Sequence, residues 1–263
     1  MFAALYGKLV AHDWRGPEPE GDAYSLFYQR SLAMGWLDGL GSGTTTAGMN
    51  VGAGGLWSMN DAGWDHPLAP AEMQLAAWFQ VEVEALARDR PLPVQPFLRC
   101  AGDTTDRVGV LELEAVQLLL PVQGLDASTR PPEALVPSMR TIYWFRECNP
   151  RSRVQVEVSV NSGQDPVVSA VARQFTDHLE RLNQDVFVCR SYNVGSPEAV
   201  LTPPFEDSFW NGPPLHGLTL RGELSEWTLD AIGWLGEVIA DTSARLGIRS
   251  PLLLTVTRSG QRR

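Results

Sequence analysis

The chain has 263 residues, a formal net charge of -10 at pH 7, 44% hydrophobic residues and 20% charged residues. This composition is typical of a globular protein and excludes a disordered chain. The apolar runs, such as Leu118 to Val122, are a handful of residues long and far shorter than the ~20 residues that cross a bilayer. No basic and then apolar leader opens the chain, so we expect a soluble, cytoplasmic protein with no membrane partner.

The basic residues and the cysteines argue against several chemistries. The 21 basic residues are all Arg except Lys8, and they form no cluster before the terminal pair Arg262 and Arg263, which argues against a nucleic-acid partner. Pyridoxal or Schiff-base chemistry would depend on Lys8 alone. The 3 cysteines are far apart, and the 4 histidines are scattered. They support neither a disulfide framework nor a metal site, so we expect no metal and no cofactor.

The first part of the chain mixes apolar runs with helical spacing. Phe2 to Val10 is apolar and predicts a strand. Asp22 stands where an N-cap belongs, ahead of a helix expected over 23–37. Pro70 and Ala71 open a second helical pattern that extends to Ala87. Strands are expected at 94–99, 108–120, 141–148 and 153–161.

The second part of the chain has a clearer strand pattern. Valines alternate with polar residues over 153–161, which indicates a strand with one apolar face. Asn149 and Pro150 form a natural turn, so this strand is expected to form an antiparallel hairpin with 141–148. The remaining predicted elements are a helix at 166–182, strands at 185–190 and 215–223, a helix at 228–246 and a strand at 251–257.

Four helices interleaved with about eight strands predict an α+β fold, in which the helices pack on a largely antiparallel or mixed sheet. After residue 153 the pattern of strand, helix and strand appears twice, which fits a ferredoxin-like arrangement or a pair of βαβ units. We expect a single α+β domain over residues 1–263. The Pro-rich segment 129–137 is the best candidate for a boundary.

Helical wheels place a charge on the apolar face of two predicted helices. At about 100° per residue, Arg30 lies near the middle of one such face and Glu82 lies within the other. A charge that points into a core needs a partner, because burying it alone costs several kcal/mol. One interpretation is a structural ion pair, of Arg30 with Glu82 or of each with a strand residue. The other is a polar pocket, in which Arg30 binds a substrate carboxylate and Glu82 acts as general acid or base.

Two aromatic segments are further candidates. Asp65 and His66 follow Trp57 and Trp64, so an acid and an imidazole would work beside a wall of indoles. The alternative is an ordinary turn whose adjacent side chains point apart. The loop 203–214 carries Phe205, Phe209 and Trp210, which would cover a pocket, contact a partner chain or pack on their own domain.

These residues support two hypotheses. The first is a cofactor-independent enzyme that performs cyclisation, condensation, isomerisation or elimination on an aromatic or polyketide-like molecule, in specialised metabolism. Its acid–base residues would be Glu82, His66 and Asp65. A carboxylate or aromatic substrate would contact Arg30, Trp57, Trp64, Phe209 and Trp210.

The second hypothesis is a non-catalytic protein-binding protein, such as a chaperone, an immunity protein or a scaffold. On this interpretation the aromatic loop 203–214 forms the interface, because interfaces favour large aromatic side chains. A homodimer is the default expectation for the quaternary state in either case.

Overall fold

The computed structural model describes residues 1–13, 21–37, 55–69, 74–83, 91–125, 152–182, 186–195 and 201–259. The strands are β1 (Phe2–Ala11), β2 (Ser58–Gly63), β3 (Leu75–Glu82), β4 (Gly109–Leu120), β5 (Val154–Asn161), β6 (Phe187–Val194), β7 (Gly217–Leu224) and β8 (Leu252–Arg258). The α-helices are α1 (Ala23–Ala33), α2 (Val94–Asp106), α4 (Val167–Ala170), α5 (Ala172–Arg181) and α6 (Leu229–Arg245). Two short 3-10 helices, η1 (Val122–Gly124) and η5 (Asp207–Phe209), complete the described elements.

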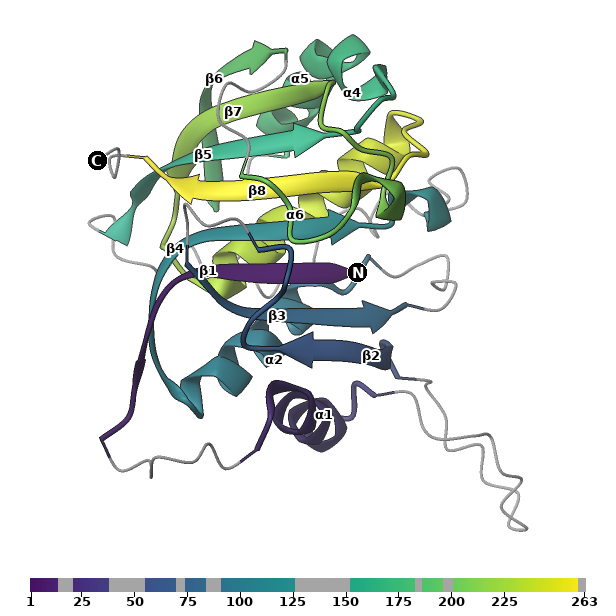
Figure 1. Cartoon of the computed structure of the whole chain (residues 1–263). Helices are drawn as coiled ribbons and strands as arrows, with labels where there is room; N and C mark the ends of the chain where they lie inside the picture. Colours follow the sequence, from purple (N-terminus) through teal and green to yellow (C-terminus); the bar gives the residue numbers. More distant parts are fainter. Residues whose placement is uncertain are drawn as a thin grey trace, which may run out of the picture.

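All the described strands form one antiparallel sheet, in the order β2-β3-β1-β4-β8-β5-β7-β6 (Figure 1). The helices α2, α5 and α6 lie behind this sheet in Figure 1, and α1 lies below it beside the edge strand β2. The predicted α+β class is therefore confirmed, and so is the largely antiparallel sheet with helices packed on it.

The sheet contains the same arrangement twice. The chain runs β1-α1-β2-β3-α2-β4 and then β5-α4-α5-β6-β7-α6-β8, and the strand orders are β2-β3-β1-β4 and β6-β7-β5-β8. Each half has the βαββαβ connectivity of a ferredoxin-like unit, so the first of the two arrangements expected after residue 153 is the observed one. The halves join through antiparallel pairing of their last strands, from Ala115 opposite Thr257 to Leu120 opposite Leu252.

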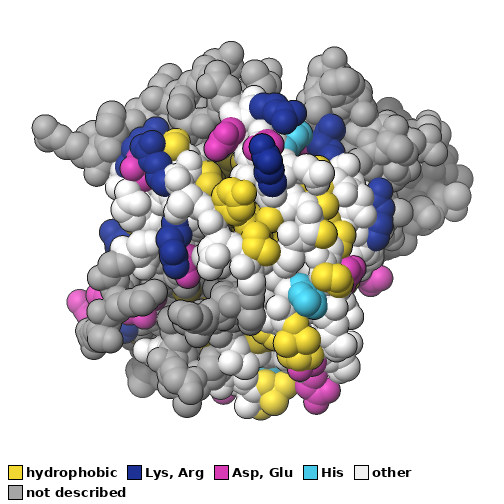
Figure 2. All heavy atoms as spheres, turned by 90° about the horizontal axis from the view of Figure 1, so that it is seen from above, with side chains coloured by type: hydrophobic (Ala, Val, Ile, Leu, Met, Phe, Trp, Pro, Cys, Tyr) yellow, Lys and Arg dark blue, Asp and Glu magenta, His cyan; other side chains and the backbone are white. Residues whose placement is uncertain are grey.

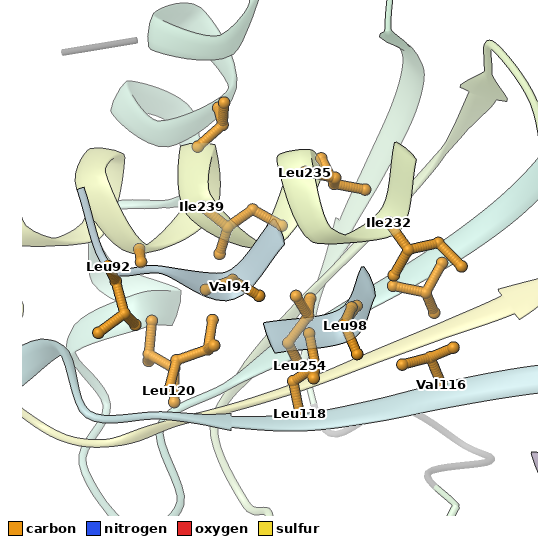
Figure 3. Packing of buried hydrophobic residues seen from close by; sticks show 14 of the residues in the cluster. Leu92, Val94, Leu98, Val116, Leu118, Leu120, Ile232, Leu235, Ile239 and Leu254 are labelled. Atoms are coloured by element: carbon orange, nitrogen blue, oxygen red, sulfur yellow. The ribbon is translucent and has the colours of Figure 1, made fainter. Parts of the chain in front are cut away.

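The main core lies between the sheet and the helices and is continuous across both halves. Figure 3 shows Leu118 of β4 and Leu254 of β8 projecting from the sheet toward Val94 and Leu98 of α2. Ile239 of α6 lies above them, and all these side chains are buried. Close packing of this kind fixes where α2 and α6 stand on the sheet.

Part of the opposite face of the sheet is covered by residues 201–216, before β7, which cross in front of the strands in Figure 1. Trp210 from this segment is buried in a small cluster on that face with Phe2, and the rings of Phe205 and Phe2 meet edge to face at 5.0 Å. Of the three expected roles for the aromatic loop, packing on its own domain is therefore the observed one for Phe205 and Trp210. Phe209 stays half exposed.

The helix predicted over 71–87 is wrong, because residues 75–82 form the strand β3 between β1 and β2. Ala77, Phe79 and Val81 alternate toward the main core, while Glu82 follows on the other face and is exposed. The apolar residues of this segment fit both a helical and a strand period, and pairing with two neighbouring strands decides between them.

The strand predicted over 94–99 is also wrong, because this segment starts the helix α2. Pro93 is the N-cap residue, and Pro96 lies in the first turn. Proline is tolerated at these positions because the first N–H groups of a helix have no partner within the helix. These prolines therefore mark the start of a helix, although proline is also common in the turns that separate strands.

The predicted hairpin is wrong in its pairing. Strand β5 pairs with β7 on one edge and with β8 on the other, so both of its edges are occupied by later strands. Residues 141–148, the turn at Asn149 and Pro150, and the candidate boundary 129–137 lie outside the described residues. The other predicted strands and helices of the described regions are confirmed with small shifts at their ends, and the helix over 166–182 is divided into α4 and α5 at Val171.

Candidate functional site

Arg30 does not pair with Glu82. Its Nε and Nη2 atoms donate to Oδ2 of Asp103, on α2, at 2.7 and 2.5 Å. Glu82 lies exposed at the end of β3, so the inward orientation expected for it is wrong. The ion pair of Arg30 is half exposed and joins α1 to α2.

The indoles do not form a wall beside Asp65 and His66. Trp57 is fully buried in the main core, where its Nε1–H donates to Ser31 Oγ at 3.3 Å. Trp64 packs half-buried against the same core. Asp65 is exposed, which agrees with the alternative of an ordinary turn.

His66 has a different aromatic neighbour. Its ring lies edge to face on Trp78 at 5.1 Å, and its Nδ1 accepts from the Leu68 N–H at 3.2 Å. Partial burial lowers the pKa of His66, although the nearby Asp61 and Asp65 act in the opposite direction. Partial burial therefore favours the neutral form of the imidazole.

A different set of polar residues meets around the carboxyl-terminal half of α2. Two concavities flank this half of the helix, and Asp103 and Asp106 line both of them. The first, here named the α1–α2 groove, has a volume of about 500 Å³. Its walls carry Leu26, Gln29, Arg30, Ala33, Thr104 and Arg107 in addition to the two aspartates.

The second concavity, here named the α2–α6 cleft, has a volume of about 290 Å³ and lies between α2, the start of α6 and the start of β4. Its floor is apolar and half-buried, and its rim carries charged groups. The floor is formed by Leu111, Leu113, Trp227 and Leu229, and the rim by Arg99, Asp103, Asp106 and Asp230.

Local structure explains how these side chains meet. Leu111 and Leu113 alternate on the helix-facing side of β4. The Trp227 Nε1–H donates to the Leu113 carbonyl at 2.8 Å, which fixes the indole on the floor. Thr228 caps α6 by accepting from the Ala231 N–H at 3.2 Å, so Asp230 lies in the first turn of that helix.

Burial shifts the carboxyl groups of the cleft toward their neutral form. It raises the pKa of Asp106, and the neighbouring carboxylate of Asp103 raises it further. The pKa of Asp230 is also raised by burial, while Arg99 opposes this effect from 3.9 Å. Within the described part of the chain, the buried Oδ1 of Asp230 has no hydrogen-bond partner. Such an oxygen has a vacant place for a donor.

Outside the groove, the surface of α1 carries further apolar side chains. Tyr24, Leu32 and Met34 are exposed large hydrophobic residues, and Tyr24 stacks on Tyr28 with ring centroids 6.3 Å apart. The buried face of this helix is formed by Ala23, Phe27 and Ser31 on its other side. A surface helix with apolar residues on both sides is unusual, and exposed apolar patches mark interaction sites.

The sequence-based prediction named Arg30 but did not name Asp103, Asp106 or Asp230, which line the two concavities. The sequence does contain a signal for Asp103 and Asp106. Once Pro93 is taken as a helix start, the spacing of Arg99, Asp103 and Asp106 places the three side chains on one face of α2. Asp230 belongs to the other half of the chain, and no local pattern connects it to α2.

The opposite end of the sheet carries a second surface with exposed hydrophobic residues. Figure 2 shows the face above β6, where hydrophobic side chains gather near the middle and basic side chains lie around them. Tyr192 and Val194 of β6 are exposed. A bulge between Cys189 and Ser191 interrupts this edge, and Arg190 pairs there with Glu223. Bulges and charges protect edge strands from pairing with other chains.

Among the residues that the structure describes, no helix is both long and apolar enough to cross a membrane, and no group of three or more His, Cys, Asp or Glu is placed to hold a metal ion. No family model, no curated protein and no solved structure matches this chain.

Proposed function

We propose that this chain is a non-catalytic protein-binding protein, that its partner is a basic protein, and that the contact surface is formed by α1 and the carboxyl-terminal half of α2. The observation that carries the proposal is the pair Asp103 and Asp106, which forms a carboxylate ridge between two open concavities. The helix α1, which packs against α2, also carries exposed apolar side chains, Tyr24 and Leu32 among them.

Both parts of this surface have a physical role in binding. The apolar side chains supply area that is removed from water, and Tyr and Met are enriched in interface cores. The carboxylates supply charge complementarity, which speeds association and selects a partner of opposite sign. The net charge of -10 acts in the same direction over longer distances.

The proposed function is the protein-binding hypothesis from the sequence, with the interface on α1 and α2 in place of the loop 203–214. Phe205 and Trp210 of the loop 203–214 contact their own sheet, so they are not available to a partner. The helices α1 and α2 offer an open surface instead. A chaperone, an immunity protein or a scaffold would each use such a surface.

The test compares two tyrosines of similar exposure at opposite ends of the molecule. Proteins that co-purify with the tagged chain from its own cells are identified, expressed and titrated one by one against the purified chain by calorimetry. Tyr24→Asp on α1 should weaken binding at least about tenfold, since it places a charge in an apolar contact. Tyr192→Asp on β6 should leave binding unchanged. Tyr24 is 40% exposed and Tyr192 is 45% exposed, so the two variants are matched.

The proposal fails if no purified partner binds directly, or if Tyr24→Asp binds as tightly as the wild type. A charge test accompanies it. Affinity should fall as salt concentration rises, and the double variant Asp103→Asn, Asp106→Asn should reduce this dependence. Circular dichroism and melting temperature confirm that each variant is folded.

A cofactor-independent acid–base enzyme is a second candidate, favoured by one observation. Asp106 and Asp230 have raised pKa values beside an apolar floor, and perturbed carboxyl groups in a cleft are candidates for acid–base catalysis. On this proposal the reaction takes place in the α2–α6 cleft. Asp230→Asn should abolish turnover of a substrate without lowering the melting temperature. A panel of aromatic carboxylates and amines, followed by mass spectrometry, tests for turnover.

A further inference from the structure

We infer that the α2–α6 cleft is a binding site for an organic cation, an ammonium or guanidinium group carried on an apolar stem. The assignment of this cation to a Lys or Arg side chain of the partner rests on the proposed function. The cation site itself rests on the shape and chemistry of the cleft.

The floor of the cleft suits the stem of such a ligand. Leu111, Leu113, Trp227 and Leu229 pack against the main core with one side and remain partly exposed on the other. An apolar stem that covers these side chains removes them from water. The indole of Trp227 is fixed by its hydrogen bond to Leu113 and adds attraction for a cation that approaches its ring.

The rim of the cleft suits the charged head. Asp106 and Asp230 project their carboxyl groups from two different helices, and Asp103 stands beside them. Asp103 is already paired with Arg30. The Gln95 side chain acts on the carboxyl group of Asp230, but the buried Oδ1 of this carboxyl group has no hydrogen-bond partner among the described residues. A buried acceptor without a donor is unfavourable, and an N–H group of a bound cation would satisfy it.

The sign of the ligand follows from the charges that face the cleft. Arg99 is the basic residue of the lining, and its Nη1 is 3.9 Å from Asp230 Oδ1, too far for a hydrogen bond. The lining contains more carboxyl groups than guanidinium groups, and Glu226 adds a further negative charge that acts on Asp230. An anion at the start of α6 would meet this repulsion, whereas a cation is attracted.

The internal repeat shows that the two halves differ at the contact between α2 and α6. Glu237 is the ninth residue after the N-cap Thr228 of α6, and it occupies the start of α2 with its carboxyl group. The ninth residue after the N-cap Pro93 of α2 is Gly102, which has no side chain to place at the start of α6. The carboxyl group that Glu237 supplies in one half therefore has no counterpart in the other, where Gly102 lies against Leu229 on the wall of the cleft.

The experiment follows the indole of Trp227 by NMR while small cations are added. Benzylamine and propylguanidine are the cationic probes, and benzyl alcohol and butyrate are the neutral and anionic controls. The indole N–H signal of Trp227 is identified by its loss in Trp227→Phe. We expect a saturable shift of this signal with both cations and none with either control.

Two matched variants assign the effect to the cleft. Asp230→Asn removes a rim carboxylate and should weaken the binding of benzylamine at least about tenfold. Asp177→Asn changes an aspartate of α5, away from the cleft, and should leave the affinity unchanged. The inference is overturned if the neutral probe shifts Trp227 as strongly as the cations do, if neither cation shifts it, or if Asp230→Asn binds benzylamine as tightly as the wild type.

The same variants separate this inference from the proposed function. If the cations bind and Asp230→Asn also weakens the purified partner, the cleft takes a side chain of that partner. If the cations bind and the partner is unaffected by Asp230→Asn, the site serves a free small cation. If the cations do not bind, the cleft inference is wrong, while the binding role of α1 still depends on Tyr24→Asp alone.

Discussion

Glu237 of α6 accepts a hydrogen bond of 3.0 Å from the backbone N–H of Gln95 in the first turn of α2. The N-cap residue of α2 is Pro93, which makes no side-chain capping bond, so a residue from the second half of the chain caps a helix of the first. Burial raises the pKa of Glu237 to about 8, against the opposing effect of this hydrogen bond. The contact therefore joins the two halves and is sensitive to pH.

We expect this carboxyl group to make folding less favourable as the pH rises. The pKa is about 8 in the folded state and 4.5 in the reference state, so between these values the folded chain holds a proton that the unfolded chain has lost. The stabilisation is complete below pH 4.5 and is lost as the pH rises to about 8, with a slope of at most ~1.4 kcal/mol per pH unit.

Glu237→Gln keeps an acceptor for Gln95 and removes the titration. The free energy of unfolding, measured by urea denaturation from pH 5 to 8, should fall for the wild type relative to this variant, by a few kcal/mol over the range. Glu180→Gln, on the exposed surface of α5, should follow the wild-type curve. Parallel curves for the wild type and Glu237→Gln would contradict the assignment.

The approach of α6 to α2 depends on two glycines. A Cβ atom on Gly233 would lie 2.6 Å from the Cα of Gln95, and one on Gly236 would lie 2.8 Å from a methyl group of Val94. In an exposed helix, Gly to Ala gains up to about 1 kcal/mol. At Gly233 the overlap is with backbone, so we expect Gly233→Ala to lower the free energy of unfolding by ~1–3 kcal/mol instead.

A second glycine variant provides the control for this prediction. Gly124, in η1, has nothing within 4 Å of the position that a Cβ would occupy. Gly124→Ala should therefore change the free energy of unfolding by less than about 0.5 kcal/mol. Urea denaturation of the two variants checks the pair, and equal effects would show that close packing at Gly233 is not the cause.

The sequence predicts those elements whose signals are local. Thr228 and the long apolar pattern after it define α6, and the alternating valines define β5. Asp22 caps α1 as expected, because Ser25 N–H donates to its Oδ1 at 2.6 Å. These features depend on neighbouring residues alone, so no knowledge of the tertiary fold is needed.

The elements that were predicted wrongly depend on distant partners. Leu75 to Glu82 becomes a strand because β1 and β2 pair with it on both sides, and a helical wheel contains no term for such pairing. The candidate site has the same property. Arg30 meets Asp103 only after α1 and α2 of the first half have packed together. Asp106 faces the same cleft as Asp230 only after the two halves have joined.

The ion pair of Arg30 and Asp103 should contribute little to stability. The two side chains are 39% and 33% exposed, so water screens their attraction. A pair in this environment is worth about 0–1 kcal/mol, whereas breaking a buried pair costs ~3–5 kcal/mol. A double-mutant cycle with Arg30→Met and Asp103→Asn, followed by urea denaturation, measures the coupling energy. A value above ~3 kcal/mol would show instead that the pair behaves as a buried one.

Two neighbouring residues of the aromatic loop 203–214 differ strongly in their exposure to water. Trp210 is 2% exposed against the sheet, and Phe209 is 50% exposed. Trp210→Ala should lower the free energy of unfolding by ~3–5 kcal/mol, because it leaves a cavity in the cluster with Phe2. Phe209→Ala should cost less than about 1 kcal/mol, since its ring is already in contact with water. If Trp210→Ala were as stable as Phe209→Ala, the loop would not be packed on its own sheet, and 203–214 would again be a candidate interface.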